Sequence, residues 1–201
     1  MRAAEALGAA LVEADVRLYR QRLEVRHLKT VGPLPIFWDR WQLAAPWRPR
    51  LQLHELLDST ASGTELLLDL KGPRVRLGKQ VLDVIRPHFG VRRFTVCARW
   101  WRLLEPFADA PVRRVHSVGN ARQLRRLLDR FTGRRLDGIS IHEDLLDRES
   151  VTSLRAVADV IMTWPVNRPE RARELLGLGI DGLITDDVAG LASAGLLEAT
   201  A

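Results

Sequence analysis

The sequence predicts an α/β fold, specifically a TIM-type (β/α) barrel, on three observations. Short apolar runs that suit strands alternate with stretches that suit helices, which is the pattern of a parallel sheet with helical crossovers. The strand-like runs number seven, one fewer than a closed barrel of this type needs. The glycine-rich turn that follows the first strand of a dinucleotide-binding fold is absent, although a doubly wound sheet stays open as the alternative.

Each main strand is a short, mostly apolar run. In chain order the strands are expected at Leu11–Leu18, Glu65–Lys71, Phe94–Ala98, Val112–Val118, Asp137–His142, Val160–Trp164 and Gly182–Thr185. Helices are expected at His54–Ser59, 77–89, 100–108, Ala121–Phe131, 148–157 and Pro169–Leu176, with a last short helix near the end of the chain. Strands joined in this way run parallel, so their carboxyl ends should meet at one mouth of the barrel.

The first quarter of the chain is less regular. Residues 2–10 are rich in alanine, which predicts a helix. Leu23–His27 alternates apolar and polar residues, which predicts a short strand that ends in a histidine. Residues 28–53 contain four prolines and four large aromatic residues, which favours a long loop or a small subdomain. We therefore expect one domain over residues 1–201, with an aromatic and proline-rich insertion at 28–53.

The composition is that of an ordinary globular protein, with 46% hydrophobic and 28% charged residues. The formal net charge of +6 comes almost entirely from arginine, because the chain has only three lysines. The arginines are scattered over the predicted helices without interleaved aromatic residues. This pattern favours a solvated basic surface and argues against nucleic acid as a partner. Such a surface would still attract anionic substrates or lipid headgroups.

The number of cysteines and the length of the apolar runs indicate where in the cell the protein is expected. Cys97 is the only cysteine, so no disulfide can form within the chain, and its apolar neighbours predict a buried, small hydrophobic side chain. No apolar run is long enough for a transmembrane segment, and the N-terminus does not resemble a signal peptide. A cytoplasmic location is therefore the default expectation.

Acidic residues interrupt two of the apolar strands. Glu13 and Asp15 are two residues apart, so both project to one face, where their like charges need a neutralising partner. Asp69 and Lys71 share a face in the same way at the end of the next main strand. Three carboxylates at strand ends suit a hard cation with oxygen ligands, Mg²⁺ or Ca²⁺. An ion-pair network bridged by Lys71 is the alternative, and the residues alone leave both open.

Five motifs, taken in their order and spacing, resemble those of the glycerophosphodiester phosphodiesterases, a barrel family. They are Glu13-Ala14-Asp15, His27 at the end of a short strand, Asp69-Leu70-Lys71, Trp164-Pro165-Val166-Asn167, and Gly179-Ile180-Asp181-Gly182 with Thr185-Asp186. The resemblance runs from about residue 2 to residue 187. Two substitutions stand out: Leu28 replaces the family's aspartate after the histidine, and Asp69 replaces a glutamate.

The resemblance implies a metal-dependent phosphodiester hydrolase that acts on glycerophosphodiesters or related lysolipids, which are small or lipid-derived substrates. It implies that Glu13, Asp15 and Asp69 bind the divalent ion, Mg²⁺ or Ca²⁺. It also implies catalytic roles for two further residues. Lys71 would place a fixed positive charge beside the phosphate, and His27 would act as a general acid or base.

Aromatic residues and one more histidine are expected near the same mouth. Trp164 ends a strand and is expected to form an apolar wall for the alcohol part of the substrate. Trp38, Trp41 and Trp47 are expected to pack the insertion, with an apolar lid for lipid chains as the alternative. His142 also ends a strand and is expected to be a rim residue.

The largest departure from the family lies at the N-terminus. The family's first strand carries His-Arg-Gly, and this chain begins inside the helix that follows that strand. The barrel is therefore expected to lack its first strand, either because the natural start lies upstream or because this member is truncated. The edges of strands 11–18 and 182–185 would then be unpaired and would favour self-association. The alternative function is a catalytically inactive barrel that binds a phosphorylated ligand or a partner chain.

Overall fold

The computed structural model describes residues 7, 9–27, 29–30, 37–39, 42–44 and 49–196. Most of the helix expected at 2–10 lies outside the described residues, and so do Trp41 and Trp47 of the insertion. Three short pieces of the insertion form a separate antiparallel sheet, with the strands β3 (Lys29–Thr30), β4 (Phe37–Asp39) and β5 (Gln42–Ala44). These strands favour the small subdomain over the irregular loop, while the single-domain organisation stays a prediction.

The main sheet has eight strands in the order β11-β10-β9-β8-β7-β6-β1-β2. Their bounds are β1 Leu11–Tyr19, β2 Arg22–Val25, β6 Glu65–Lys71, β7 Phe94–Ala98, β8 Arg113–Val118, β9 Leu136–His142, β10 Ala158–Trp164 and β11 Gly182–Leu183. All neighbouring strands run parallel except β1 and β2, which are antiparallel. The seven main strands are thus the predicted ones, in the predicted parallel arrangement, and the doubly wound order does not occur.

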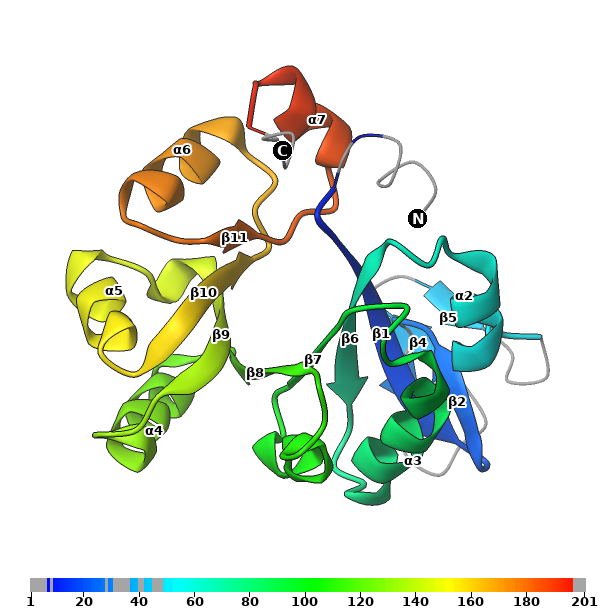
Figure 1. Cartoon of the computed structure of the whole chain (residues 1–201). Helices are drawn as coiled ribbons and strands as arrows, with labels where there is room; N and C mark the ends of the chain where they lie inside the picture. The colour runs from blue at the N-terminus through cyan, green and yellow to red at the C-terminus, as the bar shows by residue number, and fades with distance from the viewer. Residues whose placement is uncertain are drawn as a thin grey trace.

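Helices surround the curved sheet on its outer side (Figure 1). They are α2 Leu53–Ser59, α3 Arg76–Ile85, α4 Ala121–Phe131, α5 Arg148–Arg155, α6 Pro169–Gly177 and α7 Val188–Ser193, with 3₁₀ helices η1 Arg86–His88, η2 Trp101–Phe107 and η3 Glu143–Leu145. The helix expected at 100–108 is the 3₁₀ helix η2. Pro106 lies inside it and cannot donate a backbone hydrogen bond, which disfavours a regular α-helix.

One of the two edges expected to be free is partly covered. β2 folds back on β1, pairing with it from Val16 to Tyr19, and the Arg26 backbone N–H donates to the Asp15 carbonyl at 2.9 Å. The expectation of an unpaired edge along 11–18 was therefore wrong for the carboxyl half of that strand. In the part of the chain that the structure describes, β11 pairs only with β10, and no ladder joins β11 to β1. The sheet is an open half-barrel there, and the missing first strand stays a prediction.

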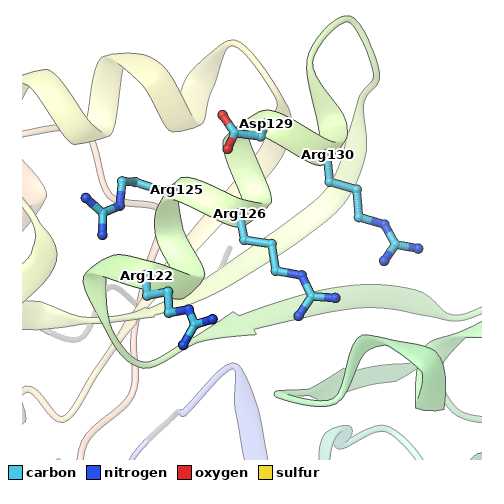
Figure 2. A pocket seen from close by; sticks show the side chains of 5 residues that line it. All are labelled: Arg122, Arg125, Arg126, Asp129 and Arg130. Carbon is cyan, nitrogen blue, oxygen red and sulfur yellow. The ribbon is translucent and has the colours of Figure 1, made fainter.

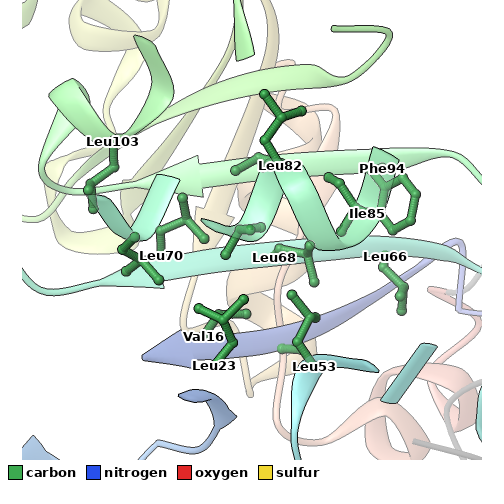
Figure 3. Close-up of a cluster of buried hydrophobic side chains, with 14 of the residues drawn as sticks. Val16, Leu23, Leu53, Leu66, Leu68, Leu70, Leu82, Ile85, Phe94 and Leu103 are labelled. Carbon is green, nitrogen blue, oxygen red and sulfur yellow. The ribbon is translucent and has the colours of Figure 1, made fainter. Parts of the chain in front are cut away.

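Two apolar layers hold the helices to the sheet. One layer packs α2, α3 and η2 against β1, β6 and β7, and its leucines interdigitate between helix and strands (Figure 3). The other packs α4 to α7 against β8, β9 and β10. Leu66, Leu68 and Leu70 point into the first layer and are each 1% exposed or less. Each such side chain contributes about 1.5–3 kcal/mol by leaving water.

The inner face of the sheet carries a smaller cluster of Leu67, Cys97, Val115 and Met162. Because β6 is buried on both faces, its sequence is almost continuously apolar until it reaches Asp69. The inner cluster forms the floor beneath the carboxyl ends of the strands, so the first polar side chains above it define the mouth. No helix of the described residues is long and apolar enough to cross a membrane.

Candidate functional site

The acidic residues meet at the mouth because of strand register. Asp15 on β1 and Asp69 on β6 are Cα partners in a parallel ladder. Glu13 precedes Asp15 by two residues and Lys71 follows Asp69 by two, so all four side chains lie on the inner face. Leu67, two residues before Asp69, belongs to the inner apolar floor and confirms this direction. The convergence expected from the sequence is therefore present.

The three carboxylates form a compact group. One carboxylate oxygen each from Glu13, Asp15 and Asp69 lies within 4.8 Å of the others. The Lys71 ammonium donates to Asp69 Oδ2 and lies 3.1 Å from Asp15 Oδ1. One ammonium thus serves two of the three acids, and the group keeps an excess of negative charge.

The pKa values reflect this crowding. Loss of water around the carboxylate, followed by repulsion from Asp15 and Asp69, raises the pKa of Glu13 from 4.5 to about 7, although part of its side chain is open to solvent. Burial also raises the pKa of Asp15, and Lys71 opposes that rise. Burial lowers the pKa of Lys71, but attraction by Asp69 and Asp15 outweighs it and keeps the ammonium charged. Near neutral pH the cluster therefore keeps about one negative charge that Lys71 does not neutralise.

Two buried oxygens show what the cluster still needs. Asp15 Oδ2 and Asp69 Oδ1 are buried and accept no hydrogen bond. A buried acceptor without a partner costs about 1–3 kcal/mol, so an ion-pair network with Lys71 alone leaves the site incompletely satisfied. A hard divalent cation with carboxylate ligands would use these oxygens and supply the missing charge. The donor set fits Mg²⁺ or Ca²⁺.

His27 lies beside the acids. It follows β2, which folds back along β1, and its Nε2 atom is 3.9 Å from Asp15 Oδ2. The side chain is 66% exposed, whereas that of Asp15 is only 9% exposed. An imidazole in this position contacts solvent on one side and the acidic cluster on the other, which suits proton transfer.

The opposite side of the mouth carries aromatic and basic side chains. Trp164 ends β10 and is the Cα partner of His142 on β9. Their rings meet edge to face, with centroids 5.0 Å apart. The guanidinium carbon of Arg99, the residue directly after β7, lies 5.4 Å from the centroid of the Trp164 ring. His142 is thus at the rim, as expected. Trp164 lies beside it with Arg99 over its ring, and its role as an apolar wall stays a prediction.

Arg99 was missed in the sequence. The only local signal for it is its place one residue beyond a predicted strand, on the end of the barrel where functional side chains gather. Its approach also depends on Gly119, since a Cβ there would lie 2.6 Å from Arg99 Nη2. Nothing local links Arg99 to Gly119 or Trp164, so the contact appears only in the folded chain.

The loops after β10 and β11 are tied together beside the acids. The Asn167 side-chain oxygen accepts hydrogen bonds from the Thr185 hydroxyl at 2.9 Å and the Asp186 backbone N–H at 3.0 Å. This explains why the Trp164–Asn167 and Thr185-Asp186 motifs occur together. Asp186 lies close enough to contribute to the raised pKa of Glu13.

Cys97 lies next to Asp69 in register but is unsuited to chemistry. Burial, reinforced by the Asp69 carboxylate, raises the pKa of the thiol well above its ordinary value. A protonated, buried thiol is a poor nucleophile. The expectation that Cys97 is buried is confirmed.

Four of the arginines gather in a separate groove on α4. Arg122, Arg126 and Arg130 extend along one side of the helix, with Arg125 and Asp129 completing the groove (Figure 2). All five side chains are exposed, and no ion pair of the described residues includes them. The groove offers neither a nucleophile nor a histidine, so it is a basic surface and not the catalytic site.

Comparisons of the whole chain identify its fold. No protein-family model and no curated relative matches the sequence. Among solved structures, a phosphodiesterase of Oleispira antarctica in complex with the product sn-glycerol-3-phosphate superposes with a TM-score of 0.73 at 20% identity, over 96% of this chain and 87% of that one.

Two glycerophosphodiester phosphodiesterase structures agree. That of Thermotoga maritima gives a TM-score of 0.72 at 19% identity, over 92% of this chain and 85% of its own. That of Parabacteroides distasonis gives 0.66 at 16% identity, over 98% and 89%. At these identities the likeness shows the fold: the chain has the TIM-like barrel architecture of these structures, as the sequence predicted.

Proposed function

We propose that the chain is a metal-dependent phosphodiester hydrolase that acts on glycerophosphodiesters or related lysolipids. The observation that carries this proposal is the convergence of Glu13, Asp15 and Asp69, with two buried carboxylate oxygens that accept no hydrogen bond. The fold supports it, because one structure of the same architecture is a phosphodiesterase bound to sn-glycerol-3-phosphate.

Glu13, Asp15 and Asp69 would hold the divalent ion, Mg²⁺ or Ca²⁺. When bound there, the ion would neutralise charge on the phosphate oxygens and polarise the phosphorus. Lys71 keeps Asp15 and Asp69 in place by contacting both carboxylates, and its ammonium faces the same mouth. It would add a fixed positive charge beside the bound phosphate.

His27 would move the proton. Its Nε2 atom lies 3.9 Å from Asp15 Oδ2, so the imidazole is next to one of the carboxylates that would hold the divalent ion. The neutral ring would accept a proton from the attacking water as its oxygen bonds to phosphorus. The protonated ring would then donate that proton to the alkoxide that departs as the P–O bond breaks. The exposed side of the ring lets it exchange protons with solvent between the two steps.

Trp164 would contact the alcohol part of the substrate. The ring stands at the end of β10, on the side of the mouth away from the β1 and β6 acids. The arginine groove on α4 would raise the concentration of anionic substrates near the protein, an effect that weakens as salt increases.

Release of glycerol 3-phosphate from glycerophosphodiesters, followed with and without Mg²⁺ or Ca²⁺, tests the proposal. Asp69→Asn should abolish metal-dependent release, whereas Asp83→Asn, an exposed acid on α3, should leave it unchanged. Absence of release from every diester, together with retained binding of glycerol 3-phosphate, would favour the inactive, ligand-binding barrel instead. A cytoplasmic location and self-association through the β11 edge stay predictions, which fractionation and size-exclusion chromatography would test.

A further inference from the structure

The mouth contains a cation that no carboxylate neutralises. Lys71 is held by Asp15 and Asp69, but none of the ion pairs among the described residues includes Arg99. The Arg99 side chain is exposed at the end of β7. A guanidinium placed in this way carries a full positive charge with donors available to a ligand.

Arg99 is nonetheless well positioned. Its guanidinium carbon lies over the Trp164 ring, 5.4 Å from the centroid, and the rings of Trp164 and His142 meet edge to face. Gly119, at the end of β8, leaves the space that Arg99 Nη2 occupies. A cation–π contact pairs no N–H group with an acceptor, so the N–H groups of the guanidinium can still donate hydrogen bonds to a ligand. Residues at the ends of three strands thus position the group without neutralising it.

Lys71 and Arg99 face different parts of the mouth. Lys71 leans toward β1, where its ammonium contacts Asp15, whereas Arg99 leans over the end of β8 toward Trp164 on β10. A phosphodiester bound at the β1 and β6 acids would therefore extend its alcohol part toward Arg99.

We propose that Arg99 selects substrates by the charge of their alcohol group, favouring an anionic alcohol and disfavouring a quaternary ammonium. The inference rests on the proposed function. An anionic group would accept paired N–H bonds from the guanidinium edge. A choline-type ammonium would seek the face of an aromatic ring, but Arg99 already covers a face of Trp164 and would repel it.

Three soluble substrates separate charge from the rest of the chemistry. Glycerophosphoglycerol has a neutral alcohol, glycerophosphocholine a cationic one, and deacylated cardiolipin an alcohol that carries a second phosphodiester anion. With the full chain and Mg²⁺, kcat/KM should be highest for deacylated cardiolipin and lowest for glycerophosphocholine, and the difference should lie mainly in KM. An equal kcat/KM for the three substrates would overturn the proposal.

Variants identify the residue responsible. Arg99→Gln should lower kcat/KM for deacylated cardiolipin about 10- to 100-fold, the cost of a charged hydrogen bond, and leave glycerophosphoglycerol nearly unchanged. Gly119→Ala should act in the same direction by displacing the guanidinium without removing its charge. Arg102→Gln, an exposed arginine on η2, is the matched control and should change nothing. Equal losses for all three substrates would mean that Arg99 binds the shared phosphate, and would refute selection by the alcohol.

Binding measured without turnover keeps this inference separate from the proposed function. Calorimetric titration of the wild-type chain with the same three compounds should show the same order of affinity, even if none of them is hydrolysed. That outcome would support Arg99 as an anion-selective residue while the hydrolase proposal failed. Hydrolysis with no difference in affinity or KM among the three compounds would support the hydrolase proposal and refute the role of Arg99. Absence of binding by all three compounds would also refute the role of Arg99.

Discussion

Asp15 and Asp69 face each other as Cα partners across β1 and β6, and Lys71 contacts both carboxylates. Parallel pairing brings together two acids that are far apart in the sequence, and Glu13 adds a third within 4.8 Å. Like charges at this separation repel strongly where water is partly excluded. The excess negative charge of this cluster should make the stability of the fold depend on divalent ions and on pH.

Divalent ions should stabilise the fold, because they bind the assembled acids and not the unfolded chain. A concentration of Mg²⁺ or Ca²⁺ about 100 times the dissociation constant would add about 2.7 kcal/mol, or roughly 5–10 °C in Tm for a chain of this size. Asp15→Asn should abolish the gain, and Asp83→Asn should keep it. A wild-type thermal melt that millimolar Mg²⁺ and Ca²⁺ leave unchanged would favour the ion-pair network.

Glu13 should make stability depend on pH when divalent ions are absent. Its pKa is raised from 4.5 to about 7 in the folded chain, so the folded state binds this proton more tightly than the unfolded state. The resulting stabilisation is complete below pH 4.5 and is lost as the pH rises through about 7. Because the pKa of Asp15 is raised as well, urea unfolding across this window should show a decline that Glu13→Gln reduces and that Glu105→Gln, an exposed control, retains in full. An unchanged decline in Glu13→Gln would assign the proton to another group.

The same proton should compete with the metal. Binding of Mg²⁺ or Ca²⁺ requires the ionised carboxylate, so apparent affinity should rise with pH up to about 7 and then level off. Calorimetric titrations in buffers of different ionisation enthalpy would count the protons released. A constant affinity over this range would show that Glu13 does not ligate the ion.

Much of this arrangement was predictable because local pattern and fold agree. Glu65–Lys71 and Phe94–Ala98 have the predicted bounds, since strands buried on both faces are continuously apolar and end at a clear polar break. The spacing of Glu13 and Asp15 fixed their common face, and the parallel sheet then brought Asp69 to the same end. These inferences needed only the period of a strand and the direction of the crossovers.

What the sequence did not predict depends on contacts between distant residues. Arg99 became part of the mouth only because Gly119 leaves room for it and the Trp164 ring lies beneath its guanidinium carbon. The covered edge of β1 required a tight reversal at Arg20 and Gln21, both with positive φ angles, and neither is a typical turn residue. A local sequence pattern predicts neither contacts between distant residues nor a tight turn made by residues that rarely form one.

His27 should matter for rate and not for stability. Its side chain is 66% exposed, so His27→Ala should leave Tm nearly unchanged. Loss of a positioned acid or base lowers kcat by about 10²–10⁴-fold. His54→Ala, an exposed histidine on α2, is the matched control and should retain full activity. Full activity of the His27→Ala variant would show that another group at the mouth acts as the general acid or base.

Lys71 distinguishes the two interpretations of the acidic cluster. Lys71→Met keeps the length of the side chain but leaves Asp15 and Asp69 without their cation. In metal-free buffer the variant should lose about 1–3 kcal/mol, between the costs for exposed and fully buried ion pairs, because Lys71 is 30% exposed.

If the cluster is a metal site, Mg²⁺ or Ca²⁺ should recover part of that loss, and the rise in Tm should exceed that of the wild type because three unneutralised carboxylates attract the ion more strongly. Hydrolysis should stay impaired at saturating metal, since the ion does not replace the ammonium beside the phosphate. Lys79→Met, which removes an exposed charge from α3, should behave as the wild type in both measurements. Full activity of Lys71→Met at saturating metal would limit Lys71 to a structural role.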